Sequence, residues 1–469
     1  MSADNMTTTT IATDAPSAFG VKLYRAIWRW NFYAGLIVVP FLTFLALTGL
    51  IMLYGNSIDT FLGPKYHVIA GGERASTITQ ALMAEQSVSG GKASLFVNPP
   101  ADEIASYFIV KAGEAQTVVV VDPHGPKILA SYSRDNTWFN WASGLHGTMW
   151  IGDIGDRILE VTAGLGIILV ITGCYLWWPR DGRGIIGALF PRLSLKSRAL
   201  WRELHKSIGF WMSVVLLFFF ITGMAWTGIW GSKIVQAWST FPAAKWDSVP
   251  LSDKTMVTLN GGALKEVPWP LEQTKLPASG SQAGVVGVPA GSPVNLNTVT
   301  DFAKTIGFNE QFRVNIPNGE EGVFTVSADS MDGDTTSPFG DHTVHIDQYT
   351  GKVLADISFA DYSLGGKSMA AGIALHQGNL GIWNTLLNTV FCLAMIFLSV
   401  SGVVMWWKRR TVGTLSAPLY PRDYHVPKAI LVIGLLVCAI FPLTGTAVVV
   451  FAIIDFFLPK HMKEAGVLA

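Results

Sequence analysis

Five long apolar stretches constrain this chain more than any other feature of its sequence. They cover residues 32–54, 158–178, 208–230, 382–407 and 429–457. A helix needs about 20 apolar residues to cross the hydrocarbon core of a bilayer. The chain is also 50% hydrophobic and only 14% charged, unlike an average soluble domain. The sequence therefore predicts a membrane protein, mainly α-helical, with about five transmembrane helices.

Basic residues predict the orientation of these helices. Seven Lys and Arg residues lie between 179 and 206, five lie between 408 and 428, and three precede the first stretch. Such residues concentrate on the cytoplasmic side of a membrane. We therefore expect the N-terminus and both short segments to be cytoplasmic, and the long segments 55–157 and 231–381 to face outward.

The expected division of the chain follows from these spans. The first stretch is interpreted as an uncleaved anchor, since it is too long for a signal peptide. The predicted parts are a disordered cytoplasmic leader (1–20), a helix (21–54), an outer domain (55–145), a helix (146–178), a cytoplasmic loop (179–206), a helix (207–230), a second outer domain (231–375), a helix (376–407), a cytoplasmic loop (408–428), a helix (429–458) and a tail (459–469).

Both outer segments contain a pattern typical of β-hairpins. In TVVVVDPHGPKILAS (117–131) and HTVHIDQYTGKVLAD (342–356), two apolar runs flank a turn sequence. We expect a small α+β domain in each segment. The stretch 276–298, rich in Gly, Ser and Pro, is interpreted as a loop within the second domain.

The membrane segments repeat as well. His146 and His376 each follow a leucine, and they lie 31 and 30 residues before Trp177 and Trp406 respectively. This spacing predicts that the two histidines lie at equal depth at the outer edge of the membrane, in the two halves of an internal repeat.

A second pair of positions repeats at the inner edge. Asn31 and His205 each lie 18 residues before a glycine of a Thr-Gly pair, Gly49 and Gly223 respectively. The repeat therefore matches Asn31 in the first half with His205 in the second.

Matched histidines on paired helices suit a b-type haem, whose iron takes one or two axial imidazoles. Glycines near both histidines would let the flat ring approach the backbone. Two other interpretations stay open: each histidine caps a helix or bonds a neighbour at the headgroup level, or the pair binds a metal ion, although zinc usually takes four ligands. Arg157 either neutralises a haem propionate or is an interfacial charge.

The chain resembles the PepSY-associated transmembrane proteins, which include inner-membrane siderophore reductases of bacterial iron uptake. The resemblance runs from about residue 20 to 460 and rests on six motifs: YRAIWRWNFYAGL, GLHGTMWIGDIGD, WRELHKSIGFW, HIDQYTGKVLAD, ALHQGNLGIWN and SVSGVVMWWKRR. It implies periplasmic PepSY-type domains on a helical bundle, b-type haem held by histidines, and electron delivery to ferric iron outside.

One position departs from the family pattern. Similar proteins commonly have histidine where this chain has Asn31, so His205 lacks its expected partner. Either the inner haem is absent, or it is five-coordinate, or another residue supplies the sixth bond. His425 is the best candidate for that residue, and the alternative is that His425 is an exposed loop histidine.

We therefore expect a reductase of ferric siderophores in the bacterial inner membrane, in contact with membrane lipid. The sequence contains no nucleotide-binding glycine motif on the inner side, so a quinol or a cytoplasmic reductase would supply electrons. A formal net charge of zero gives no reason to expect nucleic acid. The competing hypothesis is a non-enzymatic membrane module that binds or regulates a periplasmic partner.

The remaining polar clusters suggest no further site. His342 and His345 are three apart on a predicted strand and so point to opposite faces. The acidic stretch SADSMDGDTT (327–336) lacks the spacing of an EF-hand loop, and we interpret it as a solvated loop.

Overall fold

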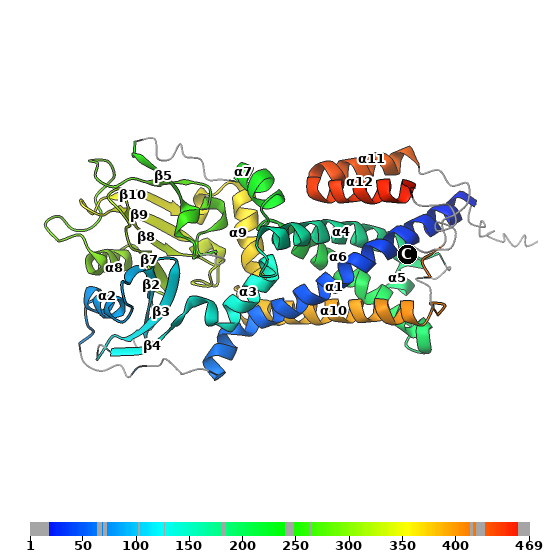
Figure 1. Ribbon diagram of the computed structural model, residues 1–469, viewed down its shortest axis with the longest axis horizontal. Coiled ribbons are helices and arrows are strands. Elements are labelled where there is room, and N and C mark those ends of the chain that lie inside the picture. The colour runs from blue at the N-terminus through cyan, green and yellow to red at the C-terminus, as the bar shows by residue number, and fades with distance from the viewer. Residues whose placement is uncertain are drawn as a thin grey trace, which may run out of the picture. The chain divides into compact units, whose positions relative to one another are not determined.

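The computed structural model describes most of the chain (Figure 1). The described residues are 18–62, 68, 73–101, 104–125, 127–180, 184–239, 248–261, 265–412, 416–418 and 427–457. They belong to two compact units. The first unit comprises Met1–Val39, Leu165–Ser213 and Ser401–Ala469, and the second comprises Pro40–Gly164 and Val214–Val400.

Among the described residues, four helices are long and apolar enough to cross a membrane. They are α1 (Ala18–Leu62), α4 (Asp153–Trp177), α6 (Ser197–Met224) and α10 (Ile382–Trp407). These helices coincide with the first four predicted spans. The chain is therefore a membrane protein.

The fifth predicted span, 429–458, is wrong as a single helix. The structure has two helices there, α11 (Lys428–Ile440) and α12 (Pro442–Phe457), which pack against each other and lie side by side in Figure 1. Pro442 contributes to the break because proline has no amide hydrogen and its ring clashes with the preceding turn. Helices of 13 and 16 residues extend only about 20 and 24 Å, less than the ~30 Å hydrocarbon core.

Eight antiparallel strands form one sheet in the second unit, in the order β10-β9-β8-β7-β1-β2-β3-β4. The strands are β1 (Lys92–Asn98), β2 (Ser106–Ala112), β3 (Ala115–Asp122), β4 (Lys127–Ser133), β7 (Phe312–Asn315), β8 (Val323–Ala328), β9 (His342–Asp347) and β10 (Val353–Ser358). Both predicted hairpins are confirmed, as β3 with β4 and as β9 with β10. A separate small sheet pairs β5 (Leu251–Thr255) with β6 (Lys275–Pro277).

The internal repeat is visible in the order of the elements. A helix precedes each set of four strands, α2 (Thr77–Gln86) in the first half and α8 (Leu296–Thr305) in the second. A short helix follows each set, α3 (Trp138–Thr148) and α9 (Leu364–Gln377), and a membrane helix comes next. The two halves meet where β1 pairs with β7, with Phe96 opposite Val314.

One apolar core joins the two halves of the sheet. It contains Phe96 and Phe108 from the first half and Phe312 from the second, together with residues of α2 and α8. The repeat predicted two similar outer units, but it did not predict that they share a sheet and a core. The division into domains at residues 145 and 231 stays a prediction.

A second core attaches α9 to the sheet. Ile373 of α9 packs with Leu354 and Ile357 of β10 and with the buried ring of Trp269. The Nε1–H of Trp269 donates a 2.8 Å hydrogen bond to the carbonyl oxygen of Ala225. These contacts fix the helix that carries His376.

The other described helical segments are short. They are α5 (Gly184–Leu189), α7 (Gln236–Ser239), the π-helical turn η2 (Trp230–Val235), and the 3-10 turns η1 (Arg134–Asn136), η4 (Met256–Leu259), η5 (Trp269–Leu271), η6 (Pro338–Gly340) and η7 (Phe359–Asp361).

Candidate functional site

His146 and His376 lie in the last turns of two short helices with similar ends. The residue that caps α3 is Met149, with φ of 51°, and the residue that caps α9 is Gly378, with φ of 84°. Such left-handed residues commonly end helices, and glycine adopts this conformation without steric cost. Each histidine is therefore held at the point where the chain leaves a short helix and turns into a membrane helix.

Threonine hydroxyls orient both imidazole rings. Thr48 Oγ1 lies 2.9 Å from His146 Nδ1, and Thr222 Oγ1 lies 2.7 Å from His376 Nδ1. Each hydroxyl also donates to a carbonyl oxygen one turn earlier in its own helix, at 2.9 and 2.8 Å. A hydroxyl has a single hydrogen, so a hydroxyl that donates to its own helix can only accept from the ring, and in that tautomer Nδ1 carries the hydrogen. This arrangement leaves the lone pair of each Nε2 for another ligand.

The two rings lie close together, with perpendicular planes, at a separation that suits one metal centre. Their centroids are 6.5 Å apart. Two imidazoles that bind one metal ion from opposite sides, through nitrogens at about 2 Å, have centroids roughly 6 Å apart. The residues present therefore fit a haem iron with two axial histidines.

Glycines lie directly beside both rings. A Cβ atom at Gly49 would be 3.7 Å from His146 Cε1, and one at Gly223 would be 3.5 Å from His376 Cε1. The absence of side chains at these positions leaves room at each ring, as a large flat group requires.

Gly144 serves a local purpose instead. A Cβ atom there would lie 2.9 Å from the indole ring of Trp150, so the absence of a side chain lets Trp150 pack against α3.

Polar side chains of α10 hold the end of the His376 helix. Asn388 Nδ2 donates to the carbonyl oxygens of His376 and Leu375, both at 2.9 Å, and Asn384 Nδ2 donates to Leu375 at 2.8 Å. Both asparagines are almost completely buried. They satisfy carbonyl groups that a helix end leaves without partners. Sequence reasoning missed them, although two amides near the start of a membrane helix are an available signal.

The inner pair has the same construction in the first unit. His205 Nδ1 lies 2.7 Å from the hydroxyl of Ser401, and Gly402 is the residue beside the ring. In the other half, Asn31 Nδ2 donates to the hydroxyl of Thr172 at 2.9 Å and to the carbonyl oxygen of Leu169 at 3.1 Å. Asn31 thus occupies a histidine-like position but offers no imidazole.

Four equivalent positions therefore share one arrangement. A Ser/Thr-Gly pair on a neighbouring membrane helix holds each of them: Thr48-Gly49 holds His146, Thr222-Gly223 holds His376, Thr172-Gly173 holds Asn31, and Ser401-Gly402 holds His205.

Arg157 lies beside Asp156, with which it forms an ion pair, and close to the backbone of Gly228. The Asp156 carboxylate also accepts a hydrogen bond from Gly228 N at 3.0 Å. The role of Arg157 near a haem propionate stays a prediction. His425 lies outside the described residues.

Four membrane helices, a large antiparallel sheet and histidines held between helices define the class of this protein. It is a membrane protein that carries a sizeable sheet domain. A family model described as the PepSY-associated TM region matches residues 28–409, which is most of the chain, so the chain belongs to this family. No curated protein matches it.

Proposed function

We propose that this protein is a haem-dependent reductase of siderophore-bound ferric iron in the bacterial inner membrane. One observation carries the proposal: the ring centroids of His146 and His376 are 6.5 Å apart, and each ring has its Nδ1 at a threonine hydroxyl. Paired imidazoles with free Nε2 atoms are the ligand set of a six-coordinate b-type haem.

The chain supplies binding and orientation at this site. A bound haem would supply a one-electron couple at the iron. Thr48 and Thr222 hold the two rings in one tautomer, and hydrogen bonding at the second ring nitrogen strengthens an imidazole as a ligand. Phe219 stacks on Phe391 with ring centroids 4.1 Å apart, and it lies 4.4 Å from the ring of His376. This aromatic wall keeps water from one side of His376.

The chemistry of the acceptor suits a simple electron-transfer role. Siderophores hold ferric iron through hard oxygen ligands, and the addition of one electron gives ferrous iron, which such ligands bind less tightly. The protein therefore needs no catalytic nucleophile. We propose that the eight-stranded sheet provides the surface on which the ferric siderophore docks.

Electrons enter from the inner side, from a quinol or a cytoplasmic reductase. An outer haem alone would leave most of the ~30 Å core to be crossed. We propose that His205 contributes to a second, inner haem. The chain would then hold two haems, and it would hold one if Asn31, in place of a histidine, prevents the inner haem from binding.

The decisive experiment uses the purified, detergent-solubilised chain. A Soret band with sharp α and β bands on reduction is expected. The dithionite-reduced protein, mixed anaerobically with a panel of ferric siderophores, should be reoxidised and should yield ferrous iron to a chelator. The matched control is His146→Phe, which keeps an aromatic ring at the site but no nitrogen ligand.

Two results would contradict parts of the proposal. No reoxidation and no ferrous iron with any siderophore would reject the reductase. A colourless protein from cells with ample haem would favour the non-enzymatic module that binds a periplasmic partner. Equal reoxidation by free ferric salts and by every siderophore would leave the reductase but reject docking on the sheet.

A further inference from the structure

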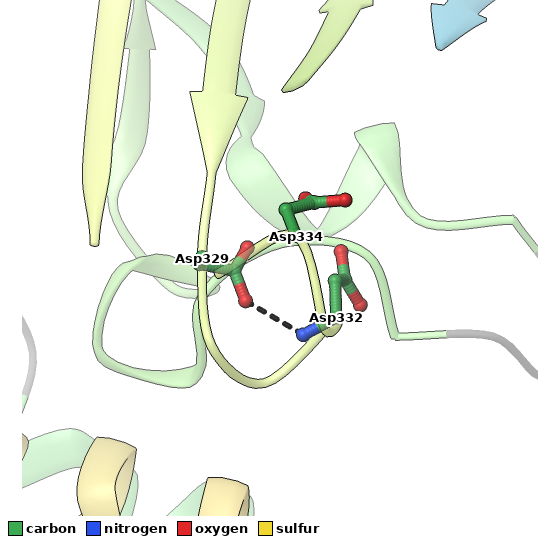
Figure 2. Close-up of side chains that lie close together, drawn as sticks. All are labelled: Asp329, Asp332 and Asp334. Atoms are coloured by element: carbon green, nitrogen blue, oxygen red, sulfur yellow. Dashed lines mark hydrogen bonds between the residues drawn. The ribbon is translucent and has the colours of Figure 1, made fainter. Parts of the chain in front are cut away.

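The acidic loop that follows β8 is buried, so the prediction of a solvated loop is wrong. The side chains of Asp329 and Asp334 are 1% and 5% exposed. Asp332 is half-buried, and the three side chains lie close together in Figure 2. Their potential ligand atoms all lie within 4.8 Å of one another. Oxygen atoms around one Ca²⁺ ion, each at about 2.3–2.6 Å, have similar separations.

The loop backbone holds this arrangement. Asp332 N donates to Asp329 Oδ1 at 2.8 Å, the bond drawn in Figure 2. Asp334 N donates to the carbonyl oxygen of Asp329 at 3.0 Å, and Gly333 has φ of 76°. A side chain at position 333 would be strained in this conformation.

A fourth carboxylate comes from a different part of the chain. Asp341, which follows the turn η6, is 1% exposed, and its Oδ1 accepts a 2.8 Å hydrogen bond from the amide of Ser330. Its Oδ2 and the Oδ2 of Asp329 are buried and accept no hydrogen bond from any described residue. The buried hydroxyl of Tyr362 likewise has no hydrogen-bond partner among the described residues. Buried oxygens of this kind require an ion, a proton or water.

The protein's own cations do not balance these carboxylates. Arg313 lies 3.0 Å from Asp334 and 3.4 Å from Asp332, and it shares Glu266 with Arg134. Within the described part of the chain, these two guanidinium groups interact with four acidic side chains, namely Glu266, Asp329, Asp332 and Asp334, and Asp341 adds a fifth negative charge close to Asp329 and Asp334. Arg313 forms ion pairs with Asp334 and Asp332, and it acts on Asp329 only at longer range. Among the described residues, no ion pair joins a cation to Asp329 or Asp341.

The pKa values of these aspartates reflect their burial and the excess of negative charge around them. Burial, together with neighbouring carboxylates, raises the pKa of Asp329 well above its usual value. Burial also raises the pKa of Asp332 to about 8 and that of Asp341 to about 7. A bound cation would favour the ionised forms of these groups at neutral pH.

We propose that Asp329, Asp332 and Asp334, with the buried Asp341 nearby, bind a divalent cation, and that this cation is Ca²⁺. The donor set contains only oxygen, which suits hard cations rather than zinc or copper. Ca²⁺ accepts irregular geometry and several carboxylates, whereas Mg²⁺ keeps most of its water. A buried cluster of carboxylates in an irregular loop suits Ca²⁺, and it leaves little room for the water that Mg²⁺ keeps.

The site would stabilise the surroundings of His376. Asn379, three residues after that histidine, donates from Nδ2 to the carbonyl oxygen of Met331 at 2.8 Å. Met331 itself is buried in the core that contains Ile373 of α9. A cation that orders this loop therefore also orders the chain on both sides of His376.

Thermal unfolding of the full chain in detergent, after treatment with EGTA, tests the proposal. Saturating Ca²⁺ should raise the Tm by at least about 3 °C, Mg²⁺ should do much less, and Tb³⁺ luminescence should report one site per chain that Ca²⁺ displaces. Glu320→Gln with Glu321→Gln removes two exposed carboxylates of the same unit and should leave the Ca²⁺ effect unchanged.

The double variant Asp329→Asn with Asp341→Asn should lose the Ca²⁺-dependent rise. Its Tm without Ca²⁺ should match or exceed that of the EGTA-treated parent, because two buried charges have been removed, and this distinguishes loss of the site from misfolding. The proposal fails if the parent shows no rise at Ca²⁺ up to about 10 mM, well above the weakest extracellular sites. It also fails if the double variant keeps the full rise.

Discussion

At the scale of single residues, the Ser/Thr-Gly pairs explain how four positions in a membrane are held alike. In each pair the hydroxyl forms a hydrogen bond with the side chain that it holds, and the glycine lies beside that side chain. The sequence repeat predicts that His146 matches His376 and that Asn31 matches His205. It does not predict the hydroxyl partners, because Thr48 and His146 are 98 residues apart and only the folded helices bring them together.

The two outer histidines should be required for the same haem. His146→Phe and His376→Phe keep an aromatic contact, which is favourable at 4.5–7 Å, but they remove a nitrogen ligand. Each variant should lose the low-spin spectrum of that haem in the purified protein. An unchanged spectrum and haem content in both would rule out axial ligation.

Loss of a supporting hydroxyl should have a smaller effect. Thr222→Val keeps His376 but removes the acceptor of its Nδ1–H, and the loss of such a partner typically weakens metal binding about 10–100-fold. Haem titration of the apoprotein measures the change. Thr446→Val, at an exposed threonine of α12, is the control and should bind haem like the parent.

The inner position offers a gain-of-function test. Thr172 and Gly173 already surround Asn31 as Thr48 and Gly49 surround His146. Asn31→His should therefore raise the low-spin haem content per chain in a pyridine haemochrome assay, and His205→Ala should abolish the gain. If haem content stays the same in Asn31→His, the inner positions do not form a haem site.

At the scale of elements, alternation along strands was predictable and the break in the last apolar stretch was not. His342 and His345 lie on opposite faces of β9: the first is partly exposed and bonded to Asp356, and the second is completely buried beside Thr325. Composition does not reveal the break before Pro442, and the proline alone does not decide it, because Pro40 lies inside the unbroken helix α1 whereas Pro442 begins a new helix.

His345 should make the sheet sensitive to acid. Burial lowers the pKa of His345 to about 3 from 6.5, so the unfolded chain binds this proton more readily than the folded one between those values. Stability is therefore present above pH 6.5 and decreases as the pH falls toward 3. His345→Gln should show a smaller loss of Tm between pH 6.5 and 4.5, whereas the control His342→Gln should behave like the parent. An equal loss of Tm in the parent and in His345→Gln would show that protonation of His345 does not cause the sensitivity to acid.

At the scale of the whole molecule, the sequence was sufficient for the membrane class, for the repeat and for two hairpins. It was not sufficient for the single eight-stranded sheet, because the pairing of β1 with β7 depends on which strand edges meet after folding. Nor did it show the buried acidic loop, since charge patterns alone do not indicate what packs over them.

Membrane orientation is testable on the whole chain. In a variant whose three native cysteines (Cys174, Cys392 and Cys438) are replaced by alanine, a cysteine at exposed Ser194 should be protected from an impermeant reagent in intact cells. A cysteine at exposed Gln282 should be labelled. Labelling at position 194 with protection at 282 would reverse the proposed orientation.

The pairing of β1 with β7 also has a consequence for biosynthesis. Phe96 and Val314 are 218 residues apart along the chain, and two membrane helices, α4 and α6, are made between them. Ribosomes add about 5–20 residues per second, so roughly 10–40 s pass between the synthesis of β1 and that of β7. During that interval the backbone hydrogen-bonding groups of β1 and the apolar side chains around Phe96 form an open sheet edge, which is a template for pairing with other chains. The interval between the two halves is therefore the stage of synthesis at which a chaperone would protect the nascent protein most.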